Sequence, residues 1–286
     1  MLKLIYTNKE IKMLTEEQKI NRRKAIGGSD VPIIMGYSSF KTPVQLWLEK
    51  RGELVFNDAQ SPQAYWGSML EDIVRQEFIK RHNVYVEQPD TITHPKFNYL
   101  QGNLDGFILN DNAVLEIKTA NAFSAHEWGQ EGQEIPQRYV LQIAYYCMLK
   151  NAPKAYCAVL IGGQDYREYV YHRNEWLEDE ILNACHEFWG MVQSGEQPPP
   201  QHEDMKHLYK ATVDKSITYN METLGALDKL TGIKKNEKLL KVQRQEQELV
   251  IQDYMKDSEF MVDEDGRVLV SWKANARGTR TFLVKE

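Results

Sequence analysis

The chain has 286 residues, of which 42% are hydrophobic and 27% are charged, close to the usage of soluble globular proteins. This composition excludes a disordered, collagen-like or disulfide-stapled chain and is sufficient for a sizeable core. The net charge of −6 does not exclude a nucleic-acid partner, because an acidic enzyme can carry its basic residues along one binding track.

Helices and strands are interleaved up to residue 193. Apolar residues at helical spacing predict helices over 67–81, 137–150 and 174–193. Runs of β-branched and aromatic residues predict strands at 84–86, 92, 99–109, 113–119, 155–161 and 168–171, with a turn at 110–112. The pattern indicates an α+β domain.

The segment 195–200 contains three consecutive prolines, which cannot continue a helix and favour an extended linker. Beyond it, 221–256 predicts a helix, or a helical hairpin interrupted at Gly232. The last strands are predicted at 260–262, 268–272 and 281–284, as a small β-meander with an Asp-Gly turn. We therefore predict a domain over 1–198 and a C-terminal helical and β-hairpin appendage over 199–286, which would serve oligomer or DNA contacts.

The cysteine pattern and the apolar runs bear on the compartment. Cys147, Cys157 and Cys185 lack C-x-x-C spacing, which argues against a disulfide framework, a four-cysteine zinc site or an iron–sulfur cluster. No apolar run approaches the ~20 residues of a membrane span, and the N-terminus is unlike a signal peptide. We expect a protein of the reducing cytoplasm, without membrane contact.

The most informative stretch joins Asn-Leu-Asp-Gly at 103–106 to Leu-Glu-Ile-Lys-Thr at 115–119. Side chains alternate along a strand, so Glu116 and Lys118 share one face, and a hairpin can bring Asp105 beside Glu116. Buried carboxylates are costly unless paired, and Mg²⁺ suits such hard oxygen ligands. Lys118 could then orient or deprotonate a water in metal-assisted phosphodiester hydrolysis. A solvated edge strand beside an Asp-Gly turn explains the same residues.

Two helices carry further candidates. Glu71, near the start of the helix predicted at 67–81, could add a carboxylate, although a solvated glutamate favoured by the helix dipole is the alternative. Gln142 and Tyr146 are four residues apart and share a face of the helix at 137–150. A solvated glutamine beside a half-buried tyrosine is the alternative reading of that pair.

The basic run at 22–24 precedes Gly27-Gly28, after which Ser29 or Asp30 can cap a helix at 31–35. A glycine-rich turn at a helix start with arginine nearby is suited to phosphate binding. An ordinary capped helix after a solvated basic run is the alternative.

Taken in order, five motifs resemble the YqaJ-type viral recombinase exonucleases. These are relatives of phage lambda exonuclease in the RecB-like branch of the PD-(D/E)xK nuclease superfamily. The motifs are Arg-Arg-x-x-Ile-Gly-Gly-Ser-Asp, Gly-x-x-x-Glu, Asn-Leu-Asp-Gly, Leu-Glu-Ile-Lys-Thr and Gln-x-x-x-Tyr, between residues 22 and 146. Segments 268–273 and 278–282 also resemble the tails of many such proteins. Leu104 replaces the family's proline, which is not a ligand.

The resemblance implies a restriction-endonuclease-like core, with a mixed central sheet flanked by helices, and a metal centre. Asp105, Glu116 and the carbonyl group of Ile117 would ligate Mg²⁺, for which Mn²⁺ would substitute. Glu71 would complete the metal shell, and Lys118 would position or activate the water. These are the catalytic and metal-binding residues that the resemblance implies.

The resemblance also implies contacts to DNA. Arg22 and Ser29 would hold the 5′-terminal phosphate, and Asn103 would lie close enough to touch it. Gln142 would lie near the scissile strand, accompanied by Tyr146.

The activity implied is that of a magnesium-dependent 5′-to-3′ exonuclease acting on one strand of linear double-stranded DNA from 5′-phosphorylated ends. It would release 5′-mononucleotides and leave 3′ overhangs for single-strand-annealing recombination. The implied partners are double-stranded DNA ends, a ring-like homo-oligomer, often a trimer, and a single-strand annealing protein in the cytoplasm of a bacterial host. A RecB-like endonuclease and a catalytically inactive DNA-binding protein on the same fold are the alternatives.

Overall fold

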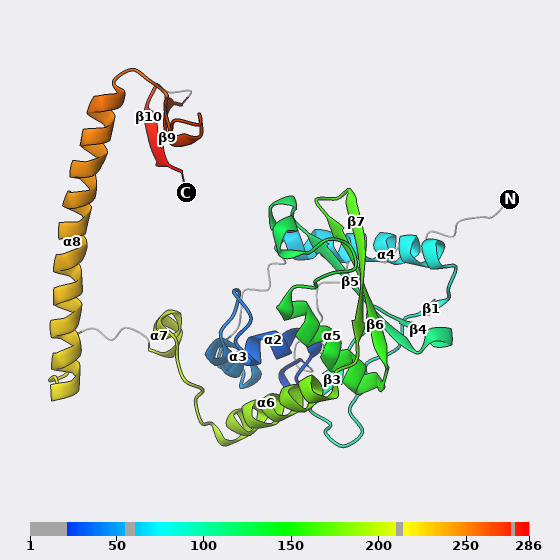
Figure 1. The fold of residues 1–286 in the computed structure, drawn as a ribbon. Helices are drawn as coiled ribbons and strands as arrows, with labels where there is room; N and C mark the ends of the chain where they lie inside the picture. Colours follow the sequence, from blue (N-terminus) through cyan, green and yellow to red (C-terminus); the bar gives the residue numbers. More distant parts are fainter. Residues whose placement is uncertain (1–21, 55–60, 210–213, 276–277, 286) are drawn as a thin grey trace. The chain divides into compact units, whose positions relative to one another are not determined.

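The computed structural model describes residues 22–54, 61–209, 214–275 and 278–285. The chain divides into two compact units, Met1–Ala211 and Thr212–Glu286, and each has its own antiparallel strand pairing (Figure 1).

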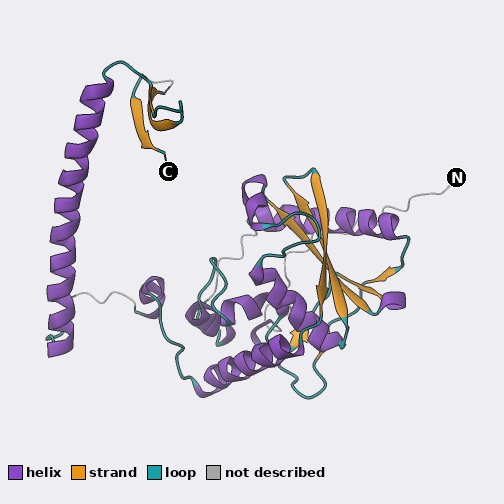
Figure 2. Ribbon diagram, in the orientation of Figure 1, coloured by secondary structure: helices purple, strands orange, loops and turns teal. Residues whose placement is uncertain are grey.

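The first unit is built on a five-stranded sheet in the order β1-β4-β5-β6-β7 (Figure 2). The parallel pairing of β5 with β6 and the antiparallel pairing of the other neighbours make the sheet mixed. The strands are β1 (Val86–Glu87), β4 (Gly106–Ile108), β5 (Ala113–Ala120), β6 (Lys154–Ile161) and β7 (Asp165–His172). This confirms the predicted mixed central sheet.

Helices cover both faces of this sheet (Figure 1). Helix α4 packs on the face of β5 that carries Leu115 and Ile117, through Val74 and Phe78. The larger core lies on the other face, where α5 meets β5 and also packs against α2 and α6. The helices are α2 (Val31–Ile34), α3 (Pro43–Lys50), α4 (Pro62–His82), α5 (Gln137–Lys150) and α6 (Glu175–Ser194). Glu116 faces the α5 side because it alternates with Leu115 and Ile117.

One predicted strand is divided in the structure. The stretch 99–109 forms β3 (Gln101–Gly102), which pairs with β2 (Ile92–Thr93), and then β4, with 103–105 between them. The physical reason lies at Asp105, whose side chain accepts the backbone N–H of Ile117 and thereby takes the place of a ladder hydrogen bond. The turn predicted at 110–112 is the short helix η2 (Leu109–Asp111), closed by Asn112 at φ 46°.

The first unit continues past the proline segment at which the sequence placed the boundary. Helices η4 (His202–Asp204) and α7 (Met205–Leu208) follow the prolines. The hydroxyl of Thr42 donates a 2.5 Å hydrogen bond to Asp204, which is fully buried. This contact ties the segment to the first unit, so the compact units divide between Ala211 and Thr212 rather than at 198.

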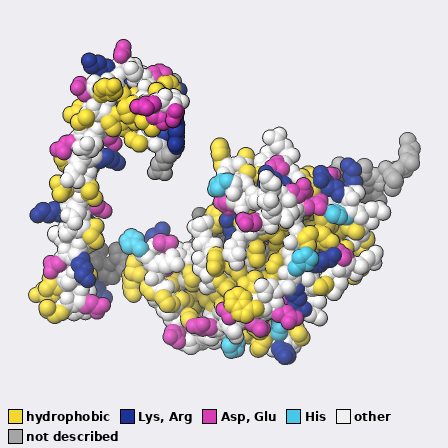
Figure 3. Space-filling model, in the orientation of Figure 1, with side chains coloured by type: hydrophobic (Ala, Val, Ile, Leu, Met, Phe, Trp, Pro, Cys, Tyr) yellow, Lys and Arg dark blue, Asp and Glu magenta, His cyan; other side chains and the backbone are white. Residues whose placement is uncertain are grey.

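The second unit consists of one long helix and a three-stranded antiparallel meander in the order β10-β9-β8. Helix α8 (Met221–Met255) is continuous through Gly232, so the alternative of a helical hairpin is wrong. A single glycine costs a helix only about 1 kcal/mol, and Asn220 caps the first turn through the N–H of Thr223 at 2.8 Å. The strands are β8 (Phe260–Val262), β9 (Val268–Ala274) and β10 (Arg280–Val284). Hydrophobic and charged side chains alternate along the exposed surface of α8 (Figure 3).

Two further expectations can be compared with the structure. Cys147, Cys157 and Cys185 are buried and carry free thiols, so the three form no disulfide. In the part of the chain that the structure describes, no helix combines the length and the apolar character that crossing a bilayer requires.

Candidate active site

The hairpin of β4 and β5 brings two carboxylates together. Gly106 pairs with Leu115 in the antiparallel register, which puts Asp105 next to the Glu116–Ile117 step. The Oδ2 atom of Asp105 accepts the backbone N–H of Ile117 at 2.8 Å. Glu116 is only 1% exposed; its Oε1 atom pairs with the ammonium group of Lys118, and its Oε2 atom has no hydrogen-bond partner among the described residues. One lysine balances only one of two buried carboxylates, so a further cation would be favourable here.

The pKa values of these groups reflect the short distance between the two buried carboxylates. Burial, and then the charge of Glu116, raise the pKa of Asp105 to about 7. Burial also raises the pKa of Glu116, although the ammonium group of Lys118 opposes that shift. For Lys118 burial favours the neutral amine, but Glu116, with which it forms an ion pair, and Asp105 raise its pKa above the ordinary value. In the metal-free protein these two carboxylates therefore favour the protonated form of Lys118.

Helix α5 holds Lys118 from the other side. The Nζ atom of Lys118 donates to Oε1 of Gln142 at 3.2 Å and lies 5.2 Å from the ring centroid of Tyr139. The amide nitrogen of Gln142 in turn donates to the hydroxyl of Tyr146 at 3.3 Å. Burial and the charge of Glu116 raise the pKa of Tyr146, so this hydroxyl stays protonated. The structure thus brings Lys118, Gln142 and Tyr146 into one hydrogen-bonded chain.

Glu71 is held separately. Its Oε1 atom accepts a 2.5 Å hydrogen bond from Arg75, one turn later on α4. Arg75 is buried and also donates to the carbonyl oxygen of Asp105 at 3.0 Å. Within the described residues, no three His, Cys, Asp or Glu side chains form a cluster that could hold a metal ion. The charge of Glu71 nevertheless raises the pKa of Glu116, so Glu71 stands near the pair without joining it.

The donor set at the pair fits a hard divalent cation. Asp105, Glu116 and the carbonyl group of Ile117 offer only oxygen atoms, which magnesium prefers. A cation would supply the partner that Oε2 of Glu116 lacks and would reverse the rise in the pKa of Asp105. The predicted roles of Glu71 and Lys118 at such a centre stay predictions.

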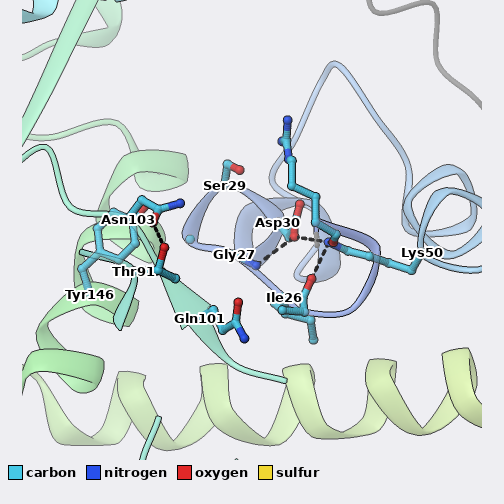
Figure 4. Close-up of a pocket in the computed structure, with 13 residues that line it drawn as sticks. Ile26, Gly27, Ser29, Asp30, Lys50, Thr91, Gln101, Asn103 and Tyr146 are labelled. Atoms are coloured by element: carbon cyan, nitrogen blue, oxygen red, sulfur yellow. Dashed lines mark hydrogen bonds and ion pairs between the residues drawn. The ribbon is translucent and has the colours of Figure 1, made fainter. Parts of the chain in front are cut away.

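A cavity of about 530 Å³ lies beside this site (Figure 4). Four of the five residues predicted to contact DNA line it: Arg22, Ser29, Asn103 and Tyr146. The fifth, Gln142, is bonded to the hydroxyl of Tyr146. Tyr146 therefore belongs both to the cavity wall and to the hydrogen-bonded chain that ends at Lys118.

Two glycines let the backbone approach the ring of Tyr146. A Cβ atom at Gly28 would lie 2.5 Å from ring carbons, and one at Gly102 would lie 2.8 Å from Leu149 and 3.0 Å from the same ring. Contacts under 3.0 Å require the neighbours to move. Gly28 and Gly102 are therefore needed for space, because no side chain fits between their backbones and Tyr146.

The role of Asp30 differs from the prediction. Ser29 or Asp30 was expected to cap a helix at 31–35, but α2 (Val31–Ile34) has no side-chain cap. Asp30 instead accepts the N–H of Gly27 at 2.9 Å and pairs with Lys50 at 2.6 Å. The ammonium group of Lys50 attracts this carboxylate back into the glycine turn.

Sequence reasoning missed several neighbours of the site. The i, i+4 spacing of Glu71 and Arg75 is a local signal for their ion pair. Thr91, whose hydroxyl donates to Oδ1 of Asn103 at 2.7 Å, gave no such signal, and neither did Lys50. Tyr139 shares a helix with Gln142, but only the fold shows that it faces Lys118.

The sequence is similar to a family of known proteins. The family model described as the YqaJ-like viral recombinase domain matches residues 19–152. An uncharacterized protein YqaJ of Bacillus subtilis (strain 168) is 37% identical over 262 residues, covering 88% of this chain and 82% of that protein.

Solved structures share the fold. An alkaline exonuclease (LHK-Exo) from Laribacter hongkongensis matches with a TM-score of 0.54 and 20% identity, covering 63% of this chain and 94% of that chain. Its complex with dAMP matches with a TM-score of 0.52 and 19% identity over the same shares. At this identity the comparison shows a shared fold.

Proposed function

Because the chain belongs to the YqaJ-like viral recombinase family, we propose that it is a magnesium-dependent 5′-to-3′ exonuclease. It digests one strand of linear double-stranded DNA from a 5′-phosphorylated end, releases 5′-mononucleotides and leaves a 3′ overhang. The observation that carries the proposal is the adjacency of two features, a buried carboxylate pair and a cavity with Arg22 in its wall, joined through Tyr146.

The chemistry at the carboxylate pair suits phosphodiester hydrolysis. A divalent cation held by Asp105, Glu116 and the Ile117 carbonyl group, with Glu71 added from α4, would polarise the phosphate and acidify a water. Lys118 is protonated and fixed by Glu116 and Gln142, so it can orient the attacking water and stabilise charge on the phosphate. Buried surroundings strengthen each of these interactions.

The cavity suits the end of a DNA strand. Arg22 offers a guanidinium group, which binds phosphate through paired donors. Ser29 adds a hydroxyl group, and the Thr91 bond fixes the amide oxygen of Asn103 as an acceptor, so its amide nitrogen can donate. The solved relative with bound dAMP, a nucleoside monophosphate, supports a nucleotide as the ligand class.

The assembly is part of the same proposal. A ring-like homo-oligomer, a trimer by the resemblance, would enclose the duplex and keep it bound between cleavage steps. A single-strand annealing protein would take up the 3′ overhang, within the cytoplasm of a bacterial host.

The test is digestion of a linear duplex that carries a 5′-phosphate on one strand only, with a supercoiled circle as the parallel substrate. We expect Mg²⁺-dependent loss of the phosphorylated strand, release of 5′-mononucleotides and an intact circle, with Mn²⁺ replacing Mg²⁺. Nicking of the circle would favour the RecB-like endonuclease. Binding without digestion of either substrate would favour the inactive DNA-binding protein.

A further inference from the structure

Lys50 is a buried cation in the wall of the cavity, and the proposed function leaves it without a role. Its side chain is 3% exposed. The Nζ atom donates to the carbonyl oxygens of Arg22 at 2.7 Å and of Ala25 at 2.6 Å, and it pairs with Oδ2 of Asp30 at 2.6 Å. An ammonium group has three N–H donors, so these three acceptors occupy all of them. Lys50 has no donor left for a ligand.

The three acceptors lie along residues 22–30, a loop that ends in the short 3₁₀ helix η1 (Gly28–Asp30) and supplies seven of the 13 residues in the cavity wall. Lys50 holds the loop at Arg22, at Ala25 and at Asp30, and Asp30 extends the hold to the N–H of Gly27 (Figure 4). The loop is therefore folded around the end of α3, and its shape depends on a side chain 20 to 28 residues away in the sequence.

The charged side chains in the cavity wall also indicate a role for Lys50. Among the described residues that line the cavity, the cations are Arg22 and Lys50 and the carboxylate is Asp30. Lys50 and Asp30 neutralise each other at 2.6 Å, which leaves Arg22 as the uncompensated cation for a phosphate. Without Lys50, the buried carboxylate of Asp30 would be unpaired and would repel an anionic ligand.

We infer that Lys50 is the positioning residue of the cavity and sets its preference for a 5′-phosphate without touching the phosphate. It acts by fixing the backbone of Arg22, Ala25 and the glycine turn, and by cancelling the charge of Asp30. This inference rests on the proposed function and names the residue that gives the site its selectivity.

The experiment compares kcat/KM on duplexes with 5′-phosphate and 5′-hydroxyl ends for wild type and K50M. We expect the phosphate preference of K50M to fall by about tenfold or more, the scale of hydrogen bonds to charged groups. The double variant D30N/K50M, which removes both charges, should regain part of the preference. It also keeps the test open if K50M fails to fold, because removing a whole buried ion pair is milder than breaking it.

Two further measurements separate positioning from simple destabilisation. R173M breaks the partly buried ion pair of Arg173 with Glu178, outside the cavity, and is the matched control. It should lower the unfolding temperature but keep the phosphate preference. Binding of the two duplexes in EDTA, measured by fluorescence anisotropy, should show the same loss for K50M without any reaction.

The outcomes are distinct. If wild type prefers 5′-phosphate and K50M keeps that preference while unfolding earlier, as R173M does, Lys50 is merely structural and the inference is wrong. A folded D30N/K50M variant with the full phosphate preference of wild type would lead to the same conclusion. If wild type itself shows no preference or no digestion, the proposed function fails, and the inference fails with it.

Discussion

The carboxylate pair on β4–β5 and the loop around Lys50 both bury charge, but they do so in opposite ways. The ammonium group of Lys50 and the Oδ2 atom of Asp30 are bonded within the chain, to each other, to two carbonyl groups and to one N–H. Glu116 has the ammonium group of Lys118 at Oε1 but no partner at Oε2, and Asp105 beside it has a pKa raised to about 7. The difference teaches that the charges around Lys50 are balanced within the chain, whereas the carboxylate pair has room for a cation from outside the chain.

The largest expected effect comes from the carboxylate side. K118A should reduce cleavage by about 10²- to 10³-fold, since under the proposed function it removes the charge that faces the reacting phosphate. DNA binding measured by anisotropy should persist, because the cavity keeps its residues. K154A, at the lysine that begins β6 and pairs with Asp111, is the control. Near-normal turnover of K118A would remove Lys118 from the mechanism.

The next effect tests the cavity. R22A should lower kcat/KM on 5′-phosphorylated ends by about a hundredfold, the scale of a charge-assisted contact, and affect 5′-hydroxyl ends much less. Equal losses on both ends would contradict a phosphate role for Arg22. The comparison with K118A is informative, because that variant should lose activity on both ends equally.

A third variant tests the packing around Tyr146, the residue that contacts both regions. G28A places a Cβ atom 2.5 Å from the tyrosine ring, and such overpacking should cost about 2 kcal/mol of unfolding free energy. Denaturant unfolding measures this. G190A is the control, since no atom lies within 4 Å of a Cβ there and the position is inside α6. If G28A were as stable as G190A, the close fit of Gly28 against Tyr146 would be wrong.

The smallest effect concerns pH. Asp105 has a pKa raised from 3.8 to about 7, so between these values the folded protein binds more protons than the unfolded chain. Without metal, stability should therefore fall as pH rises from 4 to 7, by at most about 1.4 kcal/mol per pH unit. Thermal unfolding in EDTA measures the slope, which should be smaller in D105N. Added Mg²⁺ should restore stability at pH 7 and above, and no response to Mg²⁺ would contradict a metal centre at the pair.

Much of the fold followed from local patterns. The helix at 137–150 has the bounds of α5, and strand alternation correctly separated Glu116 and Lys118 from Leu115 and Ile117. These features depend on the period of the chain, which a sequence displays directly. The continuity of α8 through Gly232 could not be predicted. A glycine indicates a local loss of helix stability, but the sequence does not show whether the rest of the helix is stable enough to offset that loss.

The sequence alone therefore sufficed for the strand that carries Glu116 and Lys118, the hairpin that brings Asp105 to them, and the helix face shared by Gln142 and Tyr146. Only the tertiary structure decided that Asp30 turns toward Lys50, that Arg75 donates to the carbonyl oxygen of Asp105, and that Gly28 and Gly102 approach one tyrosine ring. The physical reason is range. Periodicity reports which face a side chain takes within its own element, whereas the partner it meets there comes from packing between elements far apart in the chain.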